Sequence, residues 1–210
     1  MSDRRRQILD AAFQAFLTKG YVATSLEDIR TASGASTGSI YHAFKGKAAI
    51  AAALYAEAIE AWAEATAGIE RAARRKAPDT AIRASVEGLI DWGLARPDQF
   101  RLMDEMRFLE QSPEISARLA EGRVAAEQAY RDQVQAGEVR DLPWEVARAL
   151  ILGPAYEFLR QRPAAAGAAR RALSDAAWAA VRAPRTFSRS PDLDADQLTL
   201  PLAWPHVRRP

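Results

Sequence analysis

Hydrophobic residues near the start of the chain recur with the period of a helix. Ile8, Ala12 and Phe16 lie four residues apart and so share one face. This spacing predicts a helix over about residues 3–19. Gly20 stands where a helix commonly ends.

Two short helical segments are expected next. Thr24 followed by Glu27 fits a capping box, which predicts a helix that starts here and ends near Gly34. Ser36 can cap a third helix over about residues 36–43. The two segments flank one glycine with a turn of three or four residues, which is typical of a helix-turn-helix.

Prolines divide most of the remaining chain into further helices. A long helix is expected to open at Gly46-Lys47 and to run to about residue 75. Five prolines mark the boundaries that follow, because proline disfavours a continuing helix: Pro78, Pro97, Pro113, Pro143 and Pro163. The last helix is expected over about 168–183, and the five prolines after it predict an irregular tail.

Alanine occurs 46 times and no sustained period-two alternation is found, so the pattern predicts an all-α protein. We expect an N-terminal three-helix domain that contains the helix-turn-helix, followed by a larger helical domain. The expected boundaries are residues 1–47 for the first domain, 48–183 for the second and 184–210 for the tail.

In a helix-turn-helix the second helix enters the DNA major groove with its N-terminal residues foremost. Those residues are small and polar here: Ser36, Thr37, Gly38 and Ser39. The side chains that follow suit phosphate oxygens: Tyr41, His42, Lys45 and Lys47. Short polar helices around a glycine also occur in proteins that never touch DNA, so spacing alone leaves both interpretations open.

Charge and composition narrow the classes of function. The net charge of the 210 residues is only +2, but residues 1–50 alone carry a balance of +3, which favours a polyanion partner at that end. With no cysteine and two histidines far apart in sequence, thiolate sites are excluded and a histidine zinc site is not expected. We expect no catalytic residue, metal or cofactor. No apolar run approaches the roughly 18 residues of a membrane span, so the expectation is a cytoplasmic protein without a membrane partner.

The segment around the turn resembles the DNA-binding domain of TetR (tetracycline-repressor) family regulators. The segment is compared with the family pattern at Thr24, Leu26, Ile29, Ser33 to Ser36, Gly38 to His42, Phe44 and Lys47. The resemblance implies base contacts near Thr37, Gly38 and Ser39. It also implies phosphate contacts from Thr24, Tyr41, His42 and Lys47. The departures from the usual pattern are Arg30, Ser33, Ala35 and Ala43, of which Arg30 could extend to solvent or phosphate.

For the rest of the chain the resemblance implies only an architecture. Members of the family dimerise through their last two long helices and often hold an effector pocket. Residues 146–159 are apolar around most of a helix, which needs cover on all sides. The predicted dimer residues are Leu150, Gly153, Tyr156, Leu173, Ala177 and Val181. The alternative is that both faces pack inside one subunit.

A ligand pocket is the least specific prediction. Aromatic and methionine residues on several helices could surround a cavity: Trp62, Trp92, Phe100, Met103, Met106 and Tyr130. The alternative is that these residues are simply core.

Together these patterns predict a homodimeric DNA-binding regulator, a repressor on a palindromic operator, which a small-molecule effector releases. A helical interaction module that has lost DNA binding is the alternative. An enzyme is disfavoured, because no phosphate-binding glycine loop and no acid/base pair is found.

Overall fold

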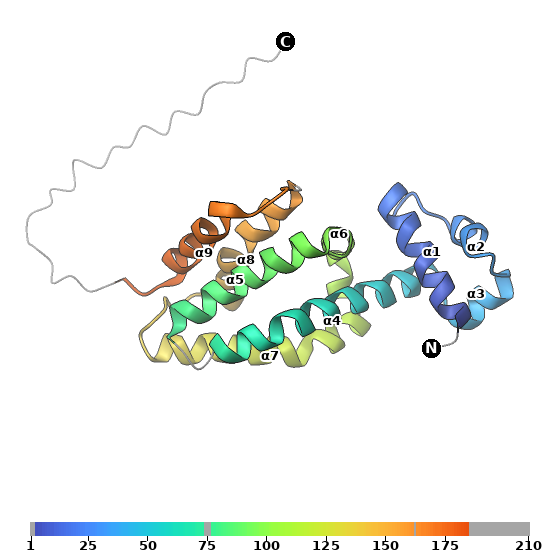
Figure 1. Cartoon of the computed structure of the whole chain (residues 1–210). Coiled ribbons are helices and arrows are strands. Elements are labelled where there is room, and N and C mark those ends of the chain that lie inside the picture. The colour runs from blue at the N-terminus through green and yellow to red at the C-terminus, as the bar shows by residue number, and fades with distance from the viewer. Residues whose placement is uncertain (1–2, 74–76, 162, 185–210) are drawn as a thin grey trace, which may run out of the picture.

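The structure is a computed structural model that describes residues 3–73, 77–161 and 163–184. Over these residues the fold is all-α, as the sequence predicts (Figure 1). The helical elements in chain order are α1 (Asp3–Lys19), α2 (Leu26–Ser33), α3 (Thr37–Ala43), α4 (Lys47–Ala73), α5 (Pro78–Ala95), α6 (Pro97–Glu105), the 3-10 helix η1 (Arg107–Gln111), α7 (Pro113–Gln135), α8 (Trp144–Arg160) and α9 (Gly167–Val181).

Helices α1, α2 and α3 form one end of the molecule, drawn in blue (Figure 1). Their apolar faces meet in a small core: Ile8 and Phe16 of α1, Ile29 of α2 and Ile40 of α3 are all buried. The predicted periodicity of α1 is therefore the periodicity of its buried face.

Helix α4 joins this end to the rest of the protein. It contacts α1 and then packs against α5, α6 and α7. Helix α5 is central to the second part, because α4 contacts it, and so do α8 and α9. The buried residues form one continuous core that includes Tyr55, Ile90 and Met103, so the division at residue 47 stays a prediction.

Proline begins several of the helices at the predicted places. Pro78, Pro97 and Pro113 occupy the first turns of α5, α6 and α7, where a missing backbone N–H costs nothing. Pro143 is the N-cap of α8. Helix α8 continues through Pro154.

The end of α9 is tied back to the loop after α7. Val139 and Arg182 form an antiparallel bridge, and the backbone N–H of Ala183 donates to the carbonyl of Glu138 at 3.0 Å. Residues 185–210, which hold almost all of the predicted tail, lie outside the described residues. Among the described helices, none is both long and apolar enough to cross a bilayer.

The six predicted dimer residues lie on different faces of α8 and α9. Tyr156, Ala177 and Val181 are buried within their own subunit, at 5%, 1% and 0% exposure. The apolar period of a helix shows which face is buried, but it does not show whether the same subunit or a partner covers that face. Leu150 and Gly153 lie on the exposed side of α8, and Leu173 is half-buried.

Candidate nucleic-acid interface

The N-cap of α2 lies one residue later than predicted. Ser25 is the N-cap: its Oγ accepts from the backbone N–H of Asp28 at 3.0 Å, and a carboxylate oxygen of Asp28 accepts from the N–H of Ser25 at 2.8 Å. The capping box is therefore Ser25 with Asp28, and the predicted pair of Thr24 with Glu27 is wrong. Both pairs have the same spacing, so spacing alone does not choose between them.

The same carboxylate ties α2 to the end of α1. Lys19 Nζ donates to Asp28 at 2.6 Å. This ammonium, together with the two Ser25 donors, holds the pKa of the Asp28 carboxyl well below its usual range. The exposed Arg30, a departure from the family pattern, is paired with Glu27 at 2.6 Å and does not disturb the helix contact.

Gly34 ends α2 and turns the chain toward α3. Its φ of 61° and ψ of 18° are left-handed, a conformation that is cheap only for glycine, as the sequence predicts. Ser36 then caps α3, because its Oγ accepts from the backbone N–H of Ser39 at 3.1 Å. This confirms the predicted start of the third helix.

Helix α3 presents a polar outer face and an apolar inner face. Ile40 and Phe44 are buried, which fixes the inner face. Most of the predicted DNA contacts lie on the outer face, where they are exposed: Ser36, Thr37, Gly38, Tyr41, His42 and Lys45. Ser39 is half-buried. The small side chains of Thr37 and Gly38 leave the first turn of α3 open to close approach.

The structure does not leave Thr24 available to a phosphate. Its side chain is 1% exposed, and its Oγ donates to the backbone carbonyl of Gly20 at 2.8 Å. Its backbone N–H donates to that same carbonyl at 3.3 Å. Both donors of Thr24 are therefore used inside the protein, and its phosphate contact stays a prediction.

Lys47 is also turned inward. Its Nζ donates to the backbone carbonyls of Tyr21 at 2.8 Å, Val22 at 3.3 Å and Thr24 at 2.8 Å. The ammonium also lies 4.5 Å from the centre of the Tyr21 ring. An ammonium has three N–H donors, and all three are used here. The side chain fastens the start of α4 to the turn after α1, a structural role that the sequence did not indicate.

Sequence analysis missed two residues at this end. Arg4 is exposed on the first turn of α1, and the guanidinium of Arg5 lies 4.7 Å from the centre of the Phe44 ring at the end of α3. The run of three arginines from Arg4 to Arg6 was visible in the sequence. Nothing in the sequence indicated that this run lies beside α3.

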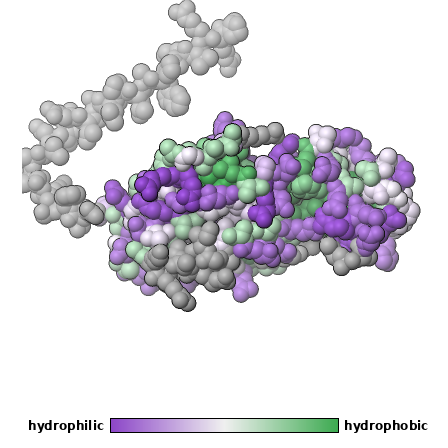
Figure 2. All heavy atoms as spheres, in the orientation of Figure 1, coloured by the Kyte–Doolittle hydropathy of each residue, from purple (hydrophilic) through white to green (hydrophobic). Residues whose placement is uncertain are grey.

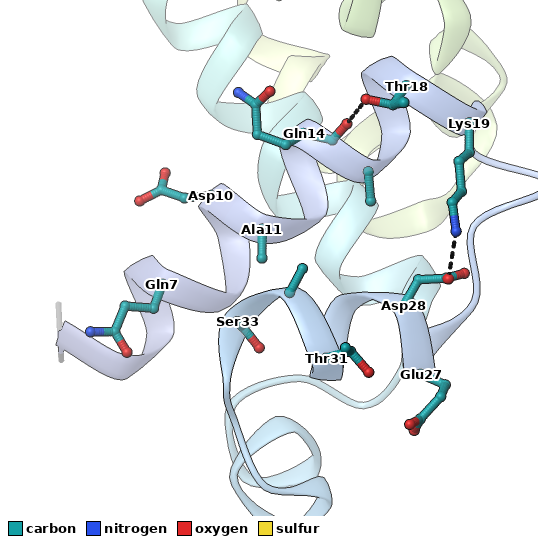
Figure 3. A pocket seen from close by; sticks show the side chains of 12 residues that line it. Gln7, Asp10, Ala11, Gln14, Thr18, Lys19, Glu27, Asp28, Thr31 and Ser33 are labelled. Atoms are coloured by element: carbon teal, nitrogen blue, oxygen red, sulfur yellow. Dashed lines mark hydrogen bonds and ion pairs between the residues drawn. The ribbon is translucent and has the colours of Figure 1, made fainter.

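A surface groove separates α1 from α2 (Figure 3). Alanines such as Ala11 and Ala32 line it between polar side chains, and the Lys19–Asp28 pair lies at one end. Its carboxylates are all paired with cations, at Asp10, Glu27 and Asp28. The groove therefore presents no uncompensated charge to a ligand.

Five of the six predicted pocket residues are buried, and Trp62 is half-buried. Met103 and Met106 are 0% and 1% exposed, so neither lines a water-sized cavity. Phe100 borders a hollow between α5, α6 and α8, in which Asp104 and Arg160 pair at 2.7 Å. Tyr130 is buried and donates to the carbonyl of Arg140 at 2.8 Å.

The two predicted pocket tryptophans share an unusual feature. The indole Nε1 atoms of Trp62 on α4 and Trp92 on α5 are buried, and neither has a hydrogen-bond partner among the described residues. A buried donor without an acceptor costs free energy, which an incoming acceptor could recover. Across the described part of the chain, no group of acidic or histidine residues is arranged to hold a metal ion.

Comparison with known sequences identifies what this end resembles. Residues 8–54 match the family described as "Bacterial regulatory proteins, tetR family". The HTH-type transcriptional repressor Rv1474c of Mycobacterium tuberculosis is 32% identical over 160 residues, which cover 72% of this chain and 78% of that protein.

Solved structures share the fold over most of the chain. A TetR family transcription regulator from Marinobacter aquaeolei VT8 superposes with a TM-score of 0.68 at 22% identity, covering 86% of this chain and 96% of that one. A regulatory protein of the same family from Rhodococcus RHA1 gives a TM-score of 0.68 at 20% identity, covering 88% and 100%.

Proposed function

Because this chain belongs to the TetR family of bacterial regulatory proteins and is a DNA-binding transcriptional regulator, we propose that it represses transcription as a homodimer on a palindromic operator. Binding of a small molecule in the helical domain releases the operator. The protein acts in the cytoplasm, where bacterial DNA lies.

The outer face of α3 is the observation that carries this proposal. An α-helix about 10–12 Å across fits the major groove, which is about 12 Å wide. Thr37, Gly38 and Ser39 on the first turn of α3 meet base edges, while Tyr41, His42 and Lys45 meet phosphate oxygens. The buried Ile40 and Phe44 hold α3 in this orientation.

The outer sides of α8 and α9 support the dimer. On α8 the exposed residues Val146, Ala149, Leu150 and Gly153 follow the spacing of one helical face. On α9 the exposed Ala172, Ala176 and Ala179 do the same. Small apolar side chains on two adjacent helices allow the same face of a second copy to approach closely. A two-fold axis at this face relates the α3 helices of the two subunits, so that each α3 binds one half-site of a palindromic operator.

The orphaned indoles support an effector site between α4 and α5. A ligand with acceptor oxygens would satisfy the buried Nε1 atoms of Trp62 and Trp92. The ligand must open this closed core. It shifts the conformational equilibrium of the protein only as far as it binds the opened form more tightly than the closed form.

The 3-10 helix η1 supplies a route from that core to the DNA-binding end. Tyr55 Oη and Arg123 both donate to the carboxylate of Glu110, at 2.7 Å and 2.6 Å. In the same short helix, the ring of Phe108 lies against the ring of Tyr21 in the turn after α1. A movement of α4 or α7 therefore reaches the DNA-binding end through this helix.

Binding to duplexes from the DNA upstream of the protein's own gene tests the proposal. Thr37→Glu places a carboxylate on the DNA face and is expected to abolish binding. Ala125→Glu, which adds the same charge on the exposed side of α7, is expected to bind like wild type. Transcription in vitro from the bound promoter should fall on addition of the protein. No sequence-preferring binding, or increased transcription, would contradict the proposal.

A further inference from the structure

Most charges at the DNA-binding end are already neutralised by ion pairs. Lys19 pairs with Asp28, Arg30 with Glu27 and Arg6 with Asp10, each at 2.6 Å. Lys47 is occupied by backbone carbonyls. Asp3 accepts a hydrogen bond from Gln7, and two exposed cations, Arg4 and Lys45, lie outside these contacts.

Arg4 and Lys45 are exposed, and neither has an acidic partner within residues 3–73, 77–161 and 163–184. Arg5 stacks on the ring of Phe44. We call Arg4, Arg5 and Lys45 the basic cluster.

The basic cluster lies at one place because of the tertiary fold. The Arg5–Phe44 contact, 4.7 Å from guanidinium carbon to ring centre, holds the first turn of α1 against the end of α3. Arg4 is the residue before Arg5, and Lys45 is the residue after Phe44. Figure 1 shows the N-terminal end of α1 beside α3.

We propose that Arg4, with Lys45, binds the phosphate backbone of the duplex beside the major groove that α3 enters. This inference rests on the proposed function. Because a helix fills the width of the groove, residues just beyond its end face the backbone that borders the groove. A guanidinium suits this task, since its fork of N–H donors matches the oxygens of a phosphate.

Arg4 thus supplies the backbone contact that the inward-turned Lys47 does not. Contacts to phosphate set the position of a protein on the duplex but do not read its sequence. Arg4 therefore contributes to affinity on every duplex, whereas Thr37 and Ser39 contribute to preference.

The test compares Arg4→Gln with Arg96→Gln, in dimers of the full chain. Arg96 is exposed at the junction of α5 and α6, so its variant loses the same charge far from α3. Affinity is measured by fluorescence anisotropy from about 50 to 200 mM salt, on the bound upstream duplex and on a scrambled duplex. Losing one phosphate contact per subunit should reduce the salt slope by about two units per dimer. Arg96→Gln should keep the wild-type slope.

Further readouts separate this role from a structural one. Arg4→Lys should restore most of the slope, and Arg4→Gln should melt like wild type. The affinity of Arg4→Gln should fall on both duplexes to the same extent. An unchanged slope for Arg4→Gln, with normal wild-type binding, would overturn this inference alone. A changed sequence preference would overturn the backbone role in favour of base contact. Failure of the wild type to bind any duplex would overturn the proposed function as well.

Discussion

The ring of Tyr21 lies 5.4 Å from the ring of Phe108, with 47° between their planes. Tyr21 belongs to the turn between α1 and α2, whereas Phe108 belongs to η1 in the second half of the fold. The same Tyr21 ring receives the Lys47 ammonium on its face. One tyrosine therefore joins η1, the turn between α1 and α2, and the start of α4.

A double-mutant cycle measures this junction. Aromatic pairs in such tilted arrangements contribute about 0.5–1.5 kcal/mol beyond the area they bury. We expect Tyr21→Ala and Phe108→Ala to couple by that amount in the free energy of unfolding, at fixed protein concentration. Phe108 is half exposed, so Phe108→Ala alone should leave the fold intact. Strict additivity of the two substitutions would show that the rings do not interact in solution.

Lys45 and Lys47 should behave differently although they are two residues apart. Lys47→Met keeps the aliphatic stem but loses three hydrogen bonds from a charged donor, so unfolding should become easier by about 2 kcal/mol or more. Lys45→Met should leave stability within about 0.5 kcal/mol and should lower the salt slope of DNA binding. Chemical denaturation and salt titration check the pair. The reverse assignment of the two effects would contradict the inward position of Lys47.

Gly153→Arg should dissociate the proposed dimer without unfolding the subunit. A Cβ built at Gly153 meets nothing within 4 Å, so the added side chain projects away from its own core. Light scattering should then report 23 kDa where wild type reports about 46 kDa, twice the mass of one chain. Gly122→Arg on α7 also meets nothing within 4 Å and should remain dimeric. A Gly153→Arg dimer of full mass would show that this face of α8 is not the interface.

Tyr55 should make stability fall at alkaline pH. Burial, and then the hydrogen bond to Glu110, raise the pKa of this phenol above its ordinary value of 10.0. The folded protein keeps the proton that the unfolded chain loses, so the contribution is complete below pH 10 and declines above it. The decline is about 1.4 kcal/mol per pH unit for one proton.

Above pH 10, Tyr55→Phe should therefore reduce the slope of the free energy of unfolding against pH by the contribution of one proton. Some loss of stability above pH 10 should remain in this variant, because burial also raises the pKa of Tyr130 and of Tyr156. Urea denaturation at several pH values above 10 measures the slope. Equal slopes for the variant and the wild type would show that Tyr55 does not contribute to the pH dependence of stability.

The sequence by itself determined the elements and the motif. The four-residue period of Ile8, Ala12 and Phe16 predicted α1, because a helix repeats its faces at that interval, and Gly20 predicted its end. Gly34 and the helix-starting prolines predicted the turn and the boundaries. Glycine and proline impose these conformations through their own backbone preferences, so the local sequence is enough to predict them.

Only the tertiary structure decided which donors and which faces are free. The ammonium of Lys47 is bound by carbonyls 23 to 26 residues earlier, and no local pattern indicates that distance. Tyr156 and Gly153 lie on one helix that is apolar on both sides, so periodicity could not tell the side facing its own core from the side facing outward. The stacking of Arg5 on Phe44 likewise joins residues far apart in sequence. Burial and hydrogen bonding are settled by the elements that pack together, and that packing places the first turn of α1 beside the end of α3.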